Sequence, residues 1–115
     1  MKLDRTKELI HCSINEAEPY EALAHVLESA IELVLIPDND FCWSSWDDSE
    51  EATKEIQKLL NMVKLYALPE RIEIAVLFAI TGPLQEVSLS SGWAEPFFKV
   101  AEKYDQVEKL LWPNS

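Results

Sequence analysis

The sequence is poor in glycine and cysteine, has no long apolar run, and carries few basic residues. It contains 2 glycines and no low-complexity tract in 115 residues, so its composition is not that of a disordered chain. A membrane-spanning helix needs about 20 consecutive apolar residues, and Glu32 interrupts the longest apolar run before Pro37. The first ten residues carry charges throughout, unlike an export signal. These absences predict one cytoplasmic domain spanning residues 1–115, with no membrane partner.

Two cysteines and two histidines are present, and none of them has the spacing of a metal site. Zinc sites use close pairs such as CxxC or HExxH, and neither pattern occurs. Cys12 and Cys42 could form a single disulfide by count, but without an export signal two reduced thiols are expected. His11 and Cys12 are neighbours that point about 100° apart on a helix, so they cannot act as a pair.

Residues 38–40 (Asp-Asn-Asp) resemble the beginning of a calcium-binding loop. Such a loop needs an oxygen ligand at its fifth position, glycine at the sixth and glutamate at the twelfth, where this chain has Cys42, Trp43 and Ser49. Asp and Asn directly after Pro37 are instead typical of a turn. No metal and no cofactor are therefore expected.

Motifs for catalysis are missing as well. No phosphate-binding glycine loop and no nucleotide fingerprint occurs, and residues 90–92 (Ser-Ser-Gly) lack the flanking glycines of a nucleophile elbow. The acidic residues cluster in charged, helix-starting stretches, whereas a catalytic carboxylate usually lies in an apolar pocket. The sequence therefore predicts a protein without enzyme activity. The alternative is a small enzyme or small-molecule-binding domain, with a pocket between sheet and helices that involves Gln85, Glu86, His25 or Tyr104.

Acidic residues outnumber basic ones by 21 to 10, and the surplus is concentrated in one part of the chain. Residues 16–58 hold twelve carboxylates and two lysines, which accounts for ten of the eleven surplus charges. Such a field repels nucleic-acid phosphates and anionic lipids, so neither is expected as a partner. It would attract a basic protein surface. The alternative explanation is that the negative charge only keeps the protein soluble.

The spacing of apolar residues predicts four helices. A short one is expected over residues 4–15, and the clearest one lies between residues 19 and 37, where apolar residues recur at i, i+3, i+4 and i+7. Its last residues, 32–36, could instead form a short strand. A third helix is expected over residues 48–65, and a fourth begins at Ser91 or Gly92 and ends at about Leu111.

Between these helices the pattern changes to that of strands. Over residues 71–81, Ile, Val and Phe alternate with Glu, Ala and Leu, so both faces are largely apolar, as in a buried strand. Leu-Pro-Glu before this stretch and Gly-Pro after it could equally begin and end a helix. After the turn at 82–83, residues 86–90 alternate again, which predicts a second strand in a hairpin. The expected fold class is α+β, a small antiparallel hairpin or sheet packed against three to four helices.

An aromatic loop lies inside the acidic stretch. Residues 37–48 are expected to be a loop, and Asp48 and Glu51 resemble the capping pair of the helix that follows. Tryptophan is common among the hot spots of interfaces. The competing interpretation is that one or both tryptophan rings of the loop fill the core. The candidate partner-binding residues are Asp38, Asp40, Trp43, Trp46, Asp47, Asp48, Glu50 and Glu51.

Two segments together resemble a known group of proteins. They are Pro-Asp-Asn-Asp-Phe-Cys-Trp-Ser-Ser-Trp-Asp-Asp (37–48) and Thr-Gly-Pro-Leu-Gln-Glu-Val-Ser-Leu-Ser-Ser-Gly-Trp (81–93). They resemble a family of small, acidic, uncharacterised bacterial proteins that have a WSSW-like loop and a GPLQE…SGW segment, and the resemblance covers most of residues 20–108. It implies a bacterial, cytoplasmic origin. The family carries no known activity, so no residue here inherits a catalytic role.

These observations predict a non-catalytic protein-binding module that recognises a basic protein. An inhibitor or immunity protein that neutralises a basic toxin, such as a nuclease, is one concrete form of that function, because acidic complementarity speeds association with such a partner. Self-association into a homo-oligomer through an apolar patch is compatible with this function and with the alternative.

Overall fold

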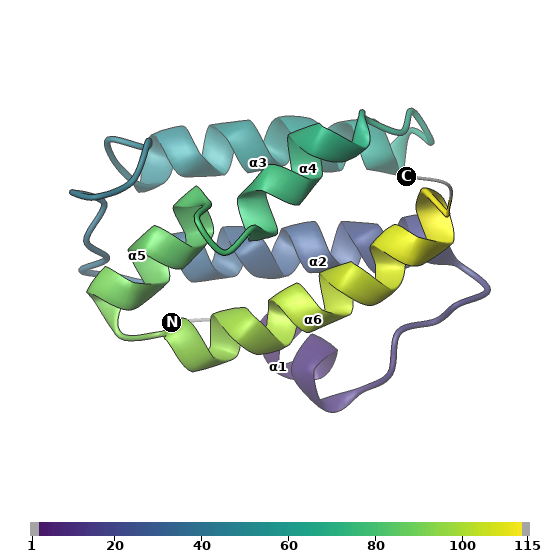
Figure 1. Ribbon diagram of the computed structural model, residues 1–115, viewed down its shortest axis with the longest axis horizontal. Helices are drawn as coiled ribbons and strands as arrows, with labels where there is room; N and C mark the ends of the chain where they lie inside the picture. The colour runs from purple at the N-terminus through teal and green to yellow at the C-terminus, as the bar shows by residue number, and fades with distance from the viewer. Residues whose placement is uncertain (1–2, 114–115) are drawn as a thin grey trace.

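Six α-helices make up the computed structural model over residues 3–113, which are the residues that it describes (Figure 1). No strand occurs within that range. In chain order the helices are α1 (Asp4–His11), α2 (Pro19–Val34), α3 (Ser49–Lys64), α4 (Arg71–Phe78), α5 (Pro83–Ser91) and α6 (Ala94–Leu111).

Helix α2 is at the centre of the arrangement. It contacts α1, α3, α5 and α6, whereas α4 packs on α5 and α6. Figure 1 shows α2 between α1 and α3, with α4, α5 and α6 on the viewer's side. The apolar residues that predicted this helix are the ones that it buries, including Leu23, Val26, Leu27 and Ala30. The predicted helix is therefore confirmed, and residues 32–34 belong to it rather than to a strand.

The predicted α+β fold is wrong, because both expected strands are helical. Residues 71–78 form α4, in which Ile74, Leu77 and Phe78 are buried. Their spacing of three and four residues is that of one helix face. The alternation of residue types over 71–81 does not distinguish a strand from a helix here, because a helix with apolar residues on most of its sides can show the same alternation. The Glu73 carboxylate accepts a hydrogen bond from the backbone N–H of Glu70 at 3.0 Å, which fixes the beginning of the helix.

The second expected strand, residues 86–90, lies in α5. This helix begins with Pro83 in its first turn and ends at Gly92, whose φ of 85° is left-handed. Proline just inside the start and glycine just past the end are the usual boundaries of a helix. The predicted turn at Gly82-Pro83 is present, but it joins two helices rather than two strands.

A carboxylate from α2 caps the beginning of α1. The Glu32 side chain accepts hydrogen bonds from the backbone N–H groups of Arg5 at 2.9 Å and Thr6 at 2.7 Å. The Thr6 hydroxyl lies 2.8 Å from both Glu32 and the Ser29 hydroxyl. Helix α1 has no side-chain cap of its own, so Glu32 satisfies donors that would otherwise lack a partner. The carboxylate also lies at the positive end of the α1 dipole.

One stretch, Arg71–Ser91, has the length and the composition that would allow a helix to cross a membrane. It consists of two helices separated at Gly82, and 39% of its most apolar window is buried inside the protein. Helix α5 packs on α2 and α6.

We predict that Glu32→Gln lowers the free energy of unfolding by about 1–3 kcal/mol, because the amide replaces one acceptor oxygen and removes the charge. Urea unfolding followed by circular dichroism measures this change. Glu95→Gln is the matched control, since Glu95 is an exposed α6 residue whose one ion pair among residues 3–113 is with Lys99, four residues away. Equal midpoints for the two variants would show that the cap does not stabilise the fold.

We predict that the two glycines respond differently to alanine. A methyl group at Gly82 overlaps the backbone carbonyl oxygen of Val76 and crowds that of Ala79, so Gly82→Ala is expected to cost about 3 kcal/mol. At Gly92 the added methyl group meets nothing within 4 Å, and only the positive φ is unfavourable. Gly92→Ala is therefore expected to cost about 1 kcal/mol. Thermal melts of both variants give the comparison, and the reverse order contradicts it.

Candidate protein-binding surface

The predicted partner-binding residues lie at one end of the molecule, in the connection between α2 and α3 and the first turn of α3 (Figure 1). We call residues 37–51 the acidic segment. Its six predicted carboxylates are all exposed, and among residues 3–113 none of them forms an ion pair. They are Asp38, Asp40, Asp47, Asp48, Glu50 and Glu51.

Asn39 ties the acidic segment to the rest of the fold. Its side-chain amide donates a hydrogen bond to the Leu33 carbonyl oxygen at 2.9 Å and accepts one from the Trp93 indole N–H at 2.8 Å. Next to it, the backbone N–H of Asp40 donates to the Ser91 hydroxyl at 2.8 Å. These bonds connect the loop to the end of α2 and to the junction of α5 and α6, so the loop has a defined shape.

The two tryptophans of the segment lie in opposite environments. Trp46 is 2% exposed, and its indole N–H donates to the Glu55 carboxylate at 3.0 Å. Trp43 is 73% exposed. The backbone N–H of Trp46 donates to the Ser44 hydroxyl at 3.2 Å, which fixes the chain between the two rings. Trp46 therefore belongs to the core, and Trp43 is the exposed ring of the segment.

Some of the predicted carboxylates also shape the segment. Asp48 caps α3, because its carboxylate accepts a hydrogen bond from the backbone N–H of Glu51 at 2.9 Å; this is the first half of the predicted capping pair. Glu51 in turn accepts the backbone N–H of Asp47 at 3.3 Å, and Asp40 accepts that of Cys42 at 2.9 Å. Because each of these carboxylates has two oxygens, local bonding still leaves acceptor capacity facing solvent.

A shallow hollow of about 400 Å³ opens in the acidic segment. Its lining includes the apolar residues Leu35, Ile36 and Phe41 and also four carboxylates. Those carboxylates are Asp38, Asp40, Asp47 and Asp48. A hollow with this lining suits a side chain that has an apolar stem and a cationic tip, as lysine and arginine have.

The structure gives no support to a metal site. Within residues 3–113, no three side chains of His, Cys, Asp or Glu lie close enough together to hold an ion. Cys12 and Cys42 are both exposed and free.

The residues named for the alternative, a small-molecule pocket, do not converge. His25 lies on α2 with Glu21 at 3.8 Å and lines two hollows, neither of which includes Gln85, Glu86 or Tyr104. Tyr104 is buried and stacks on Phe78 with ring centroids 4.7 Å apart. Burial raises the pKa of the Tyr104 hydroxyl far above its ordinary range, and the neighbouring Glu108 adds to this shift.

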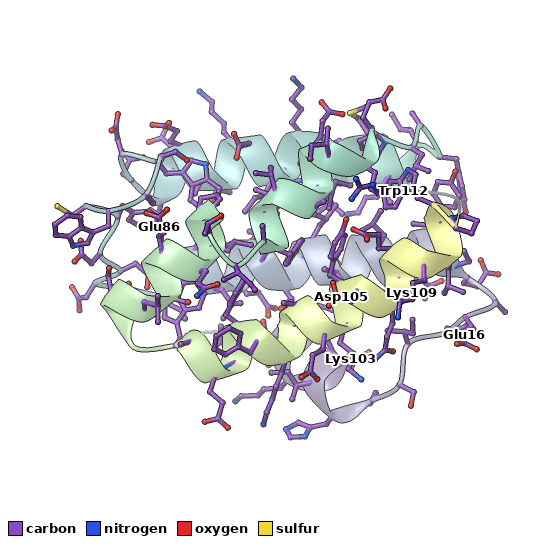
Figure 2. The ribbon with its side chains drawn as sticks, in the orientation of Figure 1. Glu16, Glu86, Lys103, Asp105, Lys109 and Trp112 are labelled. Carbon is purple, nitrogen blue, oxygen red and sulfur yellow. The ribbon has the colours of Figure 1, made fainter. Side chains whose placement is uncertain are left out.

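Asp105 and Lys109 of α6 do not join Glu86 of α5 in one site. Figure 2 shows Glu86 on α5 well separated from Asp105 and Lys109 on α6. Partial burial raises the pKa of Asp105, and the Glu108 carboxylate raises it further, while Lys109 opposes the shift. Asp105 therefore owes its raised pKa to its place on α6 rather than to a shared pocket.

Comparison with known proteins gave no relative: no protein-family model, curated protein or solved structure matches this chain. The resemblance to small acidic bacterial proteins thus stays a prediction.

We predict that the two tryptophans of the acidic segment differ sharply in their effect on stability. Trp46→Ala removes a buried ring and is expected to lower the free energy of unfolding by about 3–5 kcal/mol. Trp43→Ala is expected to change it by less than about 0.5 kcal/mol, since the ring is mostly in solvent. Chemical denaturation measures both values. A large loss in Trp43→Ala would show that this ring packs against the fold.

Proposed function

We propose that this chain is a non-catalytic protein-binding module that presents the acidic segment to a basic protein. The observation that carries the proposal is Trp43, a large aromatic ring that stands in solvent on an ordered loop with exposed carboxylates around it. An isolated exposed ring adds nothing to the stability of the monomer, whereas a ring of this type often anchors an interface.

The charge around Trp43 defines the class of partner. Six exposed carboxylates in one short segment produce a negative potential that accelerates the encounter with a positively charged protein. The same potential repels nucleic acids and anionic lipids. The hollow lined by apolar residues and four carboxylates adds a place for a lysine or arginine side chain of the partner.

An ordered loop favours tight binding. The hydrogen bonds of Asn39, Ser44 and Asp48 hold the acidic segment in one shape before a partner arrives. Preorganisation lowers the entropy that must be lost on association. A concrete form of this function is the neutralisation of a basic enzyme, such as a nuclease, whose cationic substrate site the acidic segment would cover.

The proposal is tested by affinity capture with three forms of the protein. The wild type and Tyr66→Ala are expected to capture the same basic protein, and Trp43→Ala is expected to lose it. Tyr66 is the matched control because it is also an aromatic residue with 73% exposure and lies outside the acidic segment. A captured protein that binds all three forms equally would contradict a role for Trp43.

The dependence on salt tests the electrostatic part with the purified pair. Raising NaCl from about 0.05 M to about 0.5 M screens exposed charges and is expected to weaken the affinity by about tenfold or more, mainly through slower association. Surface plasmon resonance separates the two rate constants. An affinity that does not change with salt excludes the acidic segment as the source of attraction.

A further inference from the structure

Helix α1 gains little from apolar packing. It contacts α2 and α6 and lies at the lower edge of the arrangement in Figure 1. Leu9 is the apolar side chain that it buries, and Ile10 is half-buried. Helix α4 has the same length of eight residues and buries three apolar side chains. Because apolar burial is the main source of stability, α1 is held less firmly by packing than α4 is.

Polar side chains hold α1 on α2 in place of apolar contacts. Besides the two backbone N–H groups that it caps, the Glu32 carboxylate contacts the Thr6 hydroxyl, which lies 2.8 Å from the Ser29 hydroxyl. The Arg5 guanidinium lies 3.1 Å from the Glu28 carboxylate, and both side chains are partly exposed. These groups exchange protein partners for water when the helix leaves, so each contributes far less than its full strength.

Hollows lie along the boundary between α1 and its neighbours. One of about 180 Å³ opens between α1, the connection that follows it and α2, and another of about 430 Å³ opens among α1, α2 and α3. A third, of about 480 Å³, lies between that connection and α6. Close packing provides the dispersion contacts of a core, and this boundary is incompletely packed.

The connection between α1 and α2, residues 12–18, lies on the surface. It has no regular secondary structure, and Ile14 is its one residue that is not exposed. The Lys103 ammonium group of α6, labelled in Figure 2, donates a hydrogen bond to the carbonyl oxygen of Cys12 at 2.9 Å. A segment with few buried contacts and an exposed backbone opens at a lower free energy than the core does.

We propose that α1 is a detachable strap, which opens and closes while α2 to α6 stay folded. Those five helices keep their contacts with one another when α1 leaves. A detached helix of eight residues is not stable in water, so α1 loses its helical structure in the open form. Opening uncovers the Ser29 hydroxyl and the Glu32 carboxylate, which Thr6 contacts in the closed form. The protein thus has two forms that differ in the exposure of this part of α2.

Opening of the strap leaves the acidic segment in place. The bonds that hold this segment involve Leu33, Ser91 and Trp93, which all lie outside α1. Capture of a basic protein through Trp43 therefore does not depend on the strap. A failure of one proposal leaves the other standing.

Native-state hydrogen exchange, measured by NMR, tests the strap in the wild type. After correction for intrinsic rates, the amides of α1 are expected to exchange at least about tenfold faster than the slowest amides of α2. Urea below the unfolding transition is expected to speed the α2 amides and to leave the α1 amides almost unchanged, because a local opening exposes little new surface.

Two variants separate the opening of α1 from unfolding of the whole chain. Glu32→Gln weakens the closed form and is expected to speed the α1 amides by about fivefold or more, whereas Glu95→Gln, the matched control, leaves them unchanged. Ile56→Val weakens the core at a buried position of α3 and is expected to speed the slowest α2 amides by about fivefold. It is expected to leave the α1 amides unchanged, because the closed and the open form both contain that core.

Three outcomes overturn the proposal. The first is a wild type in which the amides of α1 and α2 exchange at the same corrected rate and with the same dependence on urea. The second is an equal acceleration of α1 and α2 in Ile56→Val. Either result would show that α1 opens only when the whole chain unfolds. The third is unchanged exchange of α1 in Glu32→Gln, which would show that the cap does not hold the strap.

Discussion

The packing of α2 against four other helices is the constraint on which the rest of the structure depends. Its apolar residues fill the core, and only a narrow polar strip of the helix is left outside. The acids of that strip hold the flanking helices. Glu32 caps α1, and Glu28 lies 3.1 Å from Arg5 of α1 and 3.9 Å from Lys64 of α3. A single helix thus supplies both the apolar core and the polar contacts that align its neighbours. The acidity of this region is for that reason partly structural, and it is not all available for binding a partner.

The long helices with one apolar face could be predicted from the sequence, whereas the two short helices α4 and α5 could not. In α2, α3 and α6 the spacing of buried residues shows a single period of 3.6 residues. In α4, apolar residues such as Ile72 and Val76 lie on the exposed side as well as on the buried side. The order of apolar residues along this sequence therefore fits a buried strand as well as a helix. The signals that distinguish them were present at the ends of the elements. Glu70 and Glu73 form the start of α4, and Pro83 and Gly92 bound α5. Boundary residues were therefore more informative than the apolar pattern between them.

The candidate site could be predicted in part. The capping role of Asp48 follows from local spacing, and the concentration of carboxylates is visible by counting. Trp43 is exposed and Trp46 is buried, although the two residues lie only three positions apart. This difference depends on how the loop packs on the folded protein, and the local sequence does not encode it. The hydrogen bond between Asn39 and Trp93 joins residues 54 positions apart and has no signal in a single sequence. Such long-range contacts position the loop on the rest of the fold.

The bond between Asn39 and Trp93 also has a consequence for the order in which parts of the chain become structured. The residues that hold the acidic segment, Ser91 and Trp93, are synthesised long after the segment itself. Helix α2 can associate earlier with α1 and α3, since these helices are its neighbours in the chain. The loop acquires its final shape only when the junction of α5 and α6 docks on it. A nascent chain that has not yet reached residue 93 therefore carries the carboxylates of the acidic segment without the hydrogen bonds to Ser91 and Trp93 that order it. Docking of the junction between α5 and α6 on the loop therefore completes the hydrogen bonds that order the acidic segment.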